Sequence, residues 1–321
     1  MNKNPLISII IPAYNHEKYV EQCLNSVLEE DYPNKEIIII NDGSKDSTEE
    51  VIKSWIKLHG NDIPIIFKSR ENKGITKTLN ELLDLASGEY IVLLASDDCL
   101  ANNGIRKRYE YLKHHPDKMA VFGDFTVINE NNKILFNSGI EDFLKKDKSK
   151  LLTDKNLREQ IILNWPIVSG SVVLVKKEIF DVIGKYDESL MADDWDVYLR
   201  MVSKNLFVYF EGIVDYYRWH GNNTCSNKYE SFKNDKKVVM KNMKLFGFKE
   251  KLYLLNKYIV LTELSFIDKA KKEKEKEKEN NYFVSTILIS MFLFVNFIIK
   301  LIRKFIINII QICHPVFRNN I

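Results

Sequence analysis

Short apolar runs alternate with segments of helical period through the first 94 residues, and no other feature constrains the fold more strongly. The apolar runs lie at 6–11, 36–40, 63–67 and 90–94, and each has the length and composition of a buried strand. Between them, apolar residues recur at three- and four-residue spacing over 20–28, 51–56 and 75–86, which predicts amphipathic helices. This alternation predicts an α/β fold with a Rossmann-like sheet flanked by helices on both faces.

A polar loop follows each of the first three predicted strands, at residues 12–15, 41–44 and 70–74. Because ligands of open α/β sheets bind beyond the carboxyl ends of the strands, these loops should lie together at one edge. Asp42 follows four consecutive isoleucines and should stand at this edge, where it could accept a hydrogen bond from a base or ribose. The alternative is a plain turn made tight by Gly43 and followed by a helix cap. The chain has no G-x-G-x-x-G after its first strand and no Walker lysine, which disfavours standard dinucleotide and P-loop sites.

Two pairs of carboxylates stand at the ends of predicted elements. Asp97 and Asp98 follow the fourth strand, and oxygen ligands of this type suit Mg²⁺ or Mn²⁺ shared with substrate phosphates. The alternative for this pair is an Asp-Asp turn. Asp193 and Asp194 begin a helix predicted over 192–203, where matching to the helix dipole would explain acidic residues without chemistry.

Five motifs, taken in order, resemble the family 2 glycosyltransferases, a large inverting group with a GT-A fold and a mixed sheet. They are Ser-Ile-Ile-Ile-Pro-Ala-Tyr-Asn at 8–15, the Asn-Asp-Gly-Ser segment within 36–48, Asn-Lys-Gly at 72–74, Ala-Ser-Asp-Asp at 95–98, and Asp-Asp-Trp-Asp with Leu-Arg at 193–200. The resemblance covers about residues 5–225. It departs from the fuller family pattern at Ala95, where another aspartate is usual.

The resemblance implies a role for each matching residue. Nucleotide-sugar binding is implied for Pro12, Ala13, Tyr14, Asp42, Asn72, Gly74, Asp97 and Arg218. Asp98 and His220 are the favoured ligands of a Mg²⁺ or Mn²⁺ cofactor, with Asp97 on the ribose, and the departure at Ala95 leaves the exchange of Asp97 and Asp98 as the alternative. Asp194 is the implied general base, and Asp193 stands where the family usually has glutamate. Purely structural roles are the alternative for Arg218 and His220.

The domain organisation predicted from these patterns has three parts. A GT-A domain should occupy 1–228, with a nucleotide-sugar half at 1–118 and an acceptor half at 119–228. In the acceptor half, Trp165 should either stack on a sugar or belong to the core. A charged helical connector is predicted at 229–280 and a membrane-associating segment at 281–321.

The C-terminal prediction depends on residues 282–299, which carry no charge, and on the basic, amphipathic stretch 300–310. As a helix, the first would measure about 27 Å against a hydrocarbon core of about 30 Å, while the second would suit an anionic membrane surface. Packing against another subunit is the alternative. Four scattered cysteines and the absence of a secretory signal place the catalytic half on the cytoplasmic side of the membrane.

The expected function is transfer of a hexosyl or N-acetylhexosaminyl group from a nucleotide diphosphate sugar to a hydroxyl. The resemblance favours UDP as the nucleotide and a saccharide or lipid-linked saccharide as the acceptor, in surface polysaccharide synthesis. No nucleic-acid partner is expected. A non-catalytic nucleotide-sugar-binding scaffold and a nucleotidyltransferase are the alternatives, and the second would need a phosphate loop that the chain lacks.

Overall fold

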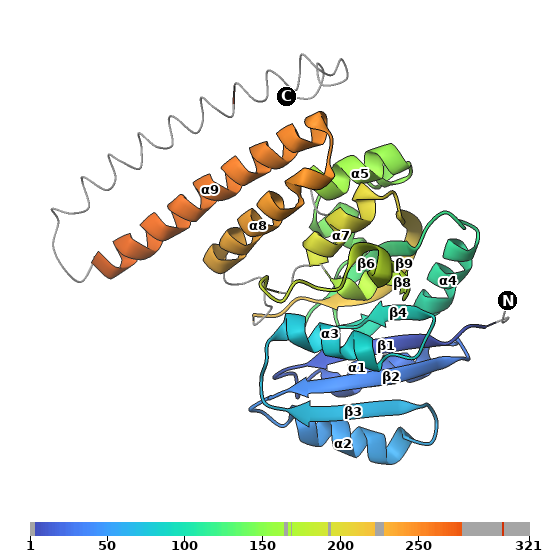
Figure 1. The fold of residues 1–321 in the computed structure, drawn as a ribbon. Helices are drawn as coiled ribbons and strands as arrows, with labels where there is room; N and C mark the ends of the chain where they lie inside the picture. Colours follow the sequence, from blue (N-terminus) through green and yellow to red (C-terminus); the bar gives the residue numbers. More distant parts are fainter. Residues whose placement is uncertain are drawn as a thin grey trace. The chain divides into compact units, whose positions relative to one another are not determined.

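The structure, a computed structural model, describes residues 4–163, 166–167, 169–191, 194–221, 228–277 and 304 (Figure 1). The chain divides into two compact units, Met1–Gly221 and Asn222–Ile321. The division falls seven residues before the predicted boundary at 228. All the motifs that resemble the family therefore lie in the first unit.

The first 93 residues form the predicted alternation of strands and helices. In chain order the elements are β1 (Ile7–Ala13), α1 (Val20–Glu29), β2 (Lys35–Asp42), α2 (Thr48–His59), β3 (Ile65–Arg70), α3 (Ile75–Leu85) and β4 (Tyr90–Leu93). These four strands are parallel in the order β3-β2-β1-β4. Their carboxyl ends meet at one edge, as predicted.

The remainder of the first unit adds antiparallel and parallel strands to the same sheet. Its helices and strands are β5 (Cys99–Leu100), α4 (Gly104–Lys113), β6 (Ala120–Ile128), β7 (Ile134–Phe136), α5 (Asp154–Leu163), β8 (Val173–Lys176), α6 (Ile179–Ile183), α7 (Asp194–Ser203) and β9 (Phe207–Arg218). The order continues from β4 through β8, β6 and β9 to β5, with β7 paired to β6. Because β8 runs antiparallel to β4 and to β6, the predicted mixed sheet is confirmed.

Short helical turns connect several of these elements. A π-helical turn, Gly139–Phe143, and a 3₁₀ turn, Lys148–Leu151, occupy the charged insert between β7 and α5. A second 3₁₀ turn, Gly170–Val172, leads into β8.

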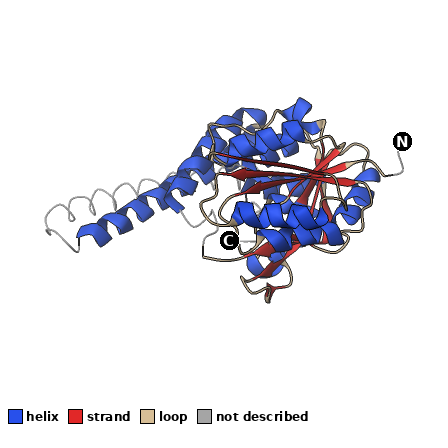
Figure 2. Ribbon diagram, turned by 90° about the horizontal axis from the view of Figure 1, so that it is seen from below, coloured by secondary structure: helices blue, strands red, loops and turns tan. Residues whose placement is uncertain are grey.

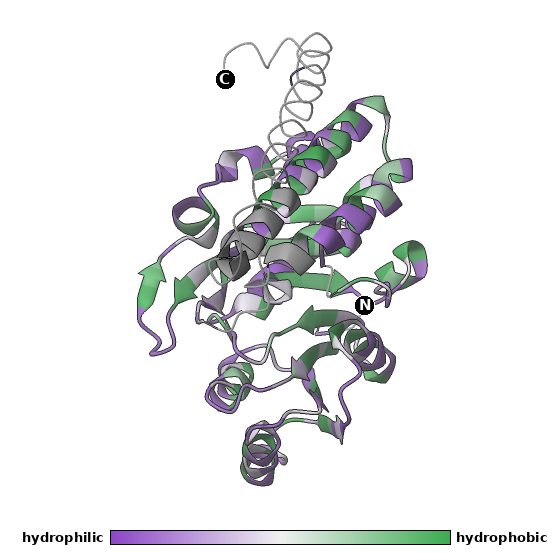
Figure 3. Ribbon diagram, turned by 90° about the vertical axis from the view of Figure 1, so that its left-hand side faces the viewer, coloured by the Kyte–Doolittle hydropathy of each residue, from purple (hydrophilic) through white to green (hydrophobic). Residues whose placement is uncertain are grey.

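Helices cover both faces of the sheet (Figure 2), and the strand sequences explain why. Alternate residues of a strand point to opposite faces, so an all-apolar strand needs cover on both. Ile9 packs in one core with residues of α1, α2 and α4, whereas Ile10 borders a small cavity shared with α3, α6 and α7. The strands are accordingly the most apolar part of the unit (Figure 3).

The described part of the second unit contains two α-helices, α8 (Lys228–Asn242) and α9 (Phe248–Glu277), joined through the 3₁₀ turn Met243–Leu245. They pack against each other and fall within the segment predicted as a helical connector. Within the residues that the structure describes, no helix has both the length and the apolar character needed to cross a bilayer. The predicted membrane-associating segment, 281–321, lies outside the described residues except for 304.

Candidate functional site

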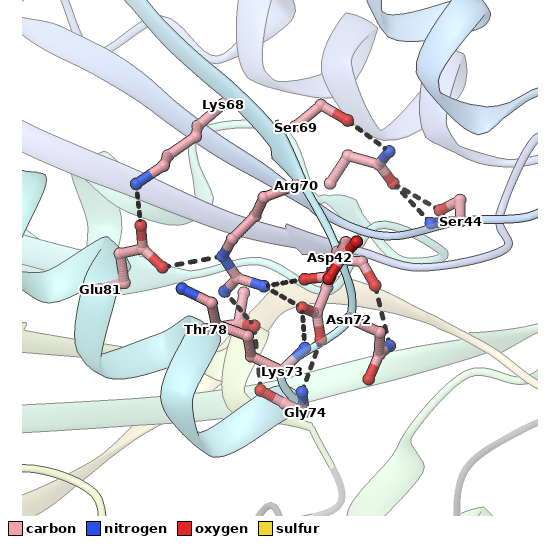
Figure 4. A network of polar contacts seen from close by, with 12 residues as sticks. Asp42, Ser44, Lys68, Ser69, Arg70, Asn72, Lys73, Gly74, Thr78 and Glu81 are labelled. Carbon is pink, nitrogen blue, oxygen red and sulfur yellow. Dashed lines mark hydrogen bonds and ion pairs between the residues drawn. The ribbon is translucent and has the colours of Figure 1, made fainter.

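Asp42 is the centre of a hydrogen-bond network where β2, β3 and α3 meet, which we call the Asp42 network (Figure 4). Its Oδ1 accepts from the backbone N–H of Lys73 at 2.8 Å and from Arg70 Nη1, and its Oδ2 accepts from the N–H of Gly74 at 3.1 Å. Arg70 is held in turn by Glu81 at 2.9 Å and by Thr78 Oγ1 at 2.9 Å. The Asp42 carboxylate is therefore fixed before any ligand arrives.

The backbone of the neighbouring loops makes this arrangement possible. Gly43 has a φ of 71°, and a Cβ there would lie 2.6 Å from the backbone nitrogen of Asn72. Gly74 has a φ of 87° and is the N-cap residue of α3, so the N-cap position supplies no side-chain hydrogen bond to the start of the helix. The Asp42 carboxylate supplies the missing negative group at the start of α3, a favourable place in the helix dipole. Asn72 Nδ2 also donates to the Asp42 carbonyl at 2.8 Å.

The loop after β1 lies against the loop after β2. The N–H of Asn15 donates to Ser44 Oγ at 2.9 Å, and the N–H of Lys45 donates to Asn15 Oδ1 at 2.8 Å. The predicted residues Pro12 and Ala13 end β1, and Tyr14 projects beyond them with 44% of its surface exposed. Tyr14 thus offers an aromatic face near the edge that carries Asp42.

A second group of residues, His16, Asp97 and His220, forms what we call the His–Asp cluster. Asp97 Oδ2 lies 3.0 Å from His220 Nε2 and 3.7 Å from His16 Nε2, and one potential ligand atom from each residue lies within 4.8 Å of the others. Although burial acts to raise it, the pKa of Asp97 is held below its ordinary value by His220 and His16. One carboxylate and two imidazoles are a suitable donor set for a divalent metal ion.

The His16 ring is oriented by a residue from another loop. Its Nδ1 lies 2.8 Å from Ser96 Oγ, so the opposite nitrogen, Nε2, faces Asp97. Burial lowers the pKa of His16, with Asp97 opposing the shift. Metal ligation needs the neutral imidazole, which this environment favours.

The carboxylate of Asp98 is hydrogen-bonded to other groups of the protein. It accepts from Ser169 Oγ at 2.8 Å, Ser171 Oγ at 3.3 Å and the N–H of Arg218 at 2.8 Å, and it is only 1% exposed. Burial and the nearby charges of Asp97 and Asp215 raise the pKa of Asp98 well above its ordinary value. Asp97 thus faces His220, whereas Asp98 faces the turn at 169–171 and the end of β9, because the chain turns after β4 and sends the two side chains apart. Which of the two carboxylates would bind a metal ion stays a prediction.

Arg218 is fully buried, and its guanidinium binds protein groups. It donates to the Asp97 carbonyl at 2.8 Å, to Gln22 Oε1 at 2.8 Å and to Asn132 Oδ1 at 2.6 Å, and it lies 5.0 Å from the centre of the Tyr19 ring. These contacts fix the backbone beside Asp97. The predicted contact of Arg218 with the donor stays a prediction.

Behind the two aspartates lies a third buried acid, Asp215. Neither of its carboxylate oxygens has a hydrogen-bond partner among the described residues, and the same is true of Arg108 Nη2. Burial raises the pKa of Asp215 to about 8, although the charge of Arg108 opposes the shift. Arg108 donates instead to the carbonyls of Gly104 at 2.9 Å and Ser171 at 2.6 Å.

Asp194, the predicted base, is the first residue of α7. Burial raises its pKa to about 7, and its charge contributes to raising the pKa of Tyr186 and Tyr198. A carboxyl with a pKa near neutrality can exchange a proton at physiological pH. The other predicted catalytic residue, Asp193, and the predicted aromatic residue Trp165 lie outside the described residues.

The orientation of α7 depends on Arg200. Its guanidinium binds Asp196 at 2.8 Å and donates to the carbonyls of Ile183, Gly184 and Lys185 at 2.5 to 3.0 Å. The helix borders the same small cavity as Leu93 of β4 and Gly170. The helix that begins with Asp194 therefore borders the same cavity as the strand that leads to Asp97.

Sequence reasoning missed three residues of these groups: His16, Ser96 and Arg70. Arg70 lies in one of the predicted polar loops, so its position was available as a signal. Ser96 lies in the motif at 95–98, but no sequence signal pairs it with His16, because the two residues lie 80 positions apart in the chain.

Comparison with known proteins agrees with this architecture. The profile of Glycosyl transferase family 2 matches residues 8–184, and the glycosyltransferase RT0329 of Rickettsia typhi is 30% identical over 71% of this chain and 70% of its own length. The structure of S. aureus TarS 1–349 with UDP-GlcNAc superposes with a TM-score of 0.58 at 16% identity, covering 79% of this chain and 72% of that one. The mannosyltransferase PcManGT of Pyrobaculum calidifontis, in complex with GDP-Man and Mn²⁺, gives 0.61 at 15% identity, covering 99% and 89%. The structural matches show a GT-A fold, and the profile match shows that the chain belongs to glycosyltransferase family 2.

Proposed function

We propose that this chain is an inverting glycosyltransferase that moves a hexosyl or N-acetylhexosaminyl group from a UDP-sugar to an acceptor hydroxyl. The observation that carries the proposal is Asp194, a carboxyl whose pKa burial raises to about 7, at the start of a helix that borders the same cavity as β4. Direct displacement at an anomeric carbon needs one base and no enzyme nucleophile.

In the proposed reaction, Asp194 accepts the proton of the acceptor hydroxyl as its oxygen bonds to the anomeric carbon. The bond from that carbon to the diphosphate oxygen breaks, and the electron pair leaves with the nucleoside diphosphate. The configuration of the sugar inverts because attack and departure occur on opposite faces. Base catalysis of this kind contributes about 10²–10⁴ in rate.

The Asp42 network supports a uracil base. A carboxylate has about four acceptor positions, and Lys73, Gly74 and Arg70 already use three of those on Asp42. One position on Oδ2 is left, which suits the single ring N–H of uracil or thymine. Guanine presents a ring N–H and an adjacent amino group, and the second donor would find no free acceptor on Asp42. The exposed ring of Tyr14 could stack on the same base.

The His–Asp cluster supports a divalent metal ion in the site. A metal bound there would neutralise the charge that develops on the departing diphosphate. Asp97 and His220 would hold it. The Arg218 side chain would keep Asp97 in place through the Asp97 carbonyl, and Asp98 would hold the chain near His220 through the N–H of Arg218.

The acceptor and location are inferred from sequence alone. An uncharged segment at 282–299 and a basic one at 300–310 suit membrane attachment. We propose a saccharide or lipid-linked saccharide acceptor, surface polysaccharide synthesis, and action at the cytoplasmic side of the membrane.

The decisive experiment measures nucleoside diphosphate release from a panel of UDP, GDP and dTDP sugars, with Mn²⁺ or Mg²⁺, for wild type and Asp194→Asn. We expect metal-dependent release from one UDP-sugar, and a loss of about 10²–10⁴ in kcat in Asp194→Asn with unchanged donor affinity. Below pH 7, kcat/KM of the wild type should fall tenfold per pH unit, because Asp194 must be ionised to act as a base.

Asp181→Asn, at an exposed position of α6, is the matched control and should keep full activity. Binding of a UDP-sugar without release in either protein would favour a scaffold. Pyrophosphate release from a nucleoside triphosphate would favour a nucleotidyltransferase.

A further inference from the structure

We propose that His16 is a third protein ligand of the metal ion, so that one carboxylate oxygen and two imidazole nitrogens select Mn²⁺ over Mg²⁺. The presence of a metal ion is taken from the proposed function, whereas the role of His16 follows from the side chains around Asp97.

The geometry of the three residues suits a shared ion. His16 and His220 both direct Nε2 toward the same oxygen of Asp97, at 3.7 and 3.0 Å. Their rings lie edge to face, with centroids 6.0 Å apart and an interplanar angle of 86°. Metal bonds of about 2.1 Å in an octahedron separate neighbouring ligand atoms by about 3.0 Å and opposite ones by about 4.2 Å. Both observed distances to Asp97 Oδ2 lie within this range.

Ser96 prepares His16 for ligation. A histidine ligand commonly uses one ring nitrogen for the metal and donates the N–H of the other to a neighbouring group. Ser96 Oγ lies 2.8 Å from His16 Nδ1 and can accept that N–H. The lone pair is then on Nε2, the nitrogen that faces Asp97.

The His16 ring is not needed to hold its own loop. The backbone N–H of His16 donates to Thr48 Oγ1 at 2.8 Å, and its carbonyl accepts from the N–H groups of Tyr19 and Val20 at 3.0 Å. The loop therefore has its anchors in the main chain. The imidazole is left with contacts to Ser96 and to the other members of the His–Asp cluster, and to Tyr19 at a centroid distance of 6.2 Å.

The second imidazole determines which ion is preferred. Mg²⁺ is a hard cation that takes oxygen ligands and dehydrates reluctantly, whereas affinity for nitrogen ligands rises along the first transition series from Mn²⁺. A site with two imidazole nitrogens should therefore bind Mn²⁺ more tightly than Mg²⁺, and Co²⁺ more tightly than Mn²⁺. Loss of His16 should reduce this preference.

The test is a Mn²⁺ titration of the full chain followed by electron paramagnetic resonance, without nucleotide. We expect nitrogen couplings from two imidazoles in the wild type and from one in His16→Ala, with Mn²⁺ affinity at least about 10-fold weaker in the variant. The Mn²⁺ to Mg²⁺ affinity ratio should fall with it. His114→Ala, at the end of α4, is the matched control and should match the wild type.

Ser96→Ala gives a second measurement if His16→Ala does not fold. It keeps the His16 ring and should weaken Mn²⁺ binding by about 10-fold. Unchanged Mn²⁺ affinity in both variants, or one nitrogen coupling in the wild type, would overturn the proposal. A loss of UDP affinity alone would mean that His16 contacts the diphosphate. Two nitrogen couplings without transferase activity would uphold the metal site and overturn the proposed function instead.

Discussion

The Asp42 network and the His–Asp cluster both place a buried carboxylate beyond a strand of one sheet, yet they are prepared for different tasks. Asp42 is bound by one guanidinium and two backbone N–H groups, none of which can leave. Asp97 is bound by imidazole nitrogens, which can exchange a proton for a metal ion. We therefore expect the first site to recognise a ligand by a fixed shape, and the second to change its bonding when a metal ion binds.

Asp97→Asn should break the His–Asp cluster most completely, because it removes the only carboxylate of the group. We expect a loss of about 10³ in kcat/KM and a loss of measurable Mn²⁺ binding, since the metal contributes several kcal/mol of charge stabilisation. Steady-state kinetics and a Mn²⁺ titration would measure both effects. Mn²⁺ affinity within a factor of three of wild type would show that Asp97 is not a metal ligand.

Arg70→Ala should test whether the Asp42 network is a rigid, preformed site, because it lowers the stability of the folded protein. It leaves the Asp42 carboxylate buried without its cation, so the free energy of unfolding should fall by about 3 kcal/mol in a denaturant titration. Lys68→Ala is the control from the same network, since Lys68 is half exposed and pairs only with Glu81 at the rim; it should cost less than about 1 kcal/mol. Equal losses in the two variants would show that the Asp42 network is not a rigid, preformed site.

Asp215→Asn tests a third buried carboxylate, which has no hydrogen-bond partner among the described residues, in contrast to Asp42 and Asp97. The folded protein keeps Asp215 protonated up to about pH 8, whereas the unfolded chain ionises near pH 3.8, so unfolding releases a proton between these values. Stability of the wild type should therefore fall as pH rises through this window. The advantage of the variant should grow by on the order of 4 kcal/mol between pH 5 and pH 8. A pH-independent difference would show that Asp215 is already ionised and paired with Arg108.

The sheet could be predicted where apolar runs are short and uninterrupted. β1, β2 and β4 match the predicted strands within two residues at each end. β9 is different, because Glu211 and Gly212 interrupt its apolar run, yet the strand continues through them to Arg218. Neighbouring strands cover this part of β9, and the sequence of β9 alone does not contain that information.

The parts of the candidate site that could be predicted are those whose residues lie close together in the chain. Asp42 and the start of α3 were predicted because a strand end and a glycine turn mark them. Which of Asp97 and Asp98 meets His220 could not be predicted, because a turn between adjacent residues decides it. His16 was missed since Ser96 and His220 approach it only in the folded chain.

The position of Asp98 has a consequence for protein design. Asp98 joins the turn at 169–171 to the end of β9, two residues before His220. A graft of His16, Asp97 and His220 alone would carry the donor atoms into a new scaffold without the joint that holds His220 in place. The smallest transferable unit is therefore larger than the proposed ligand set, and it includes Asp98 with the two segments that Asp98 joins.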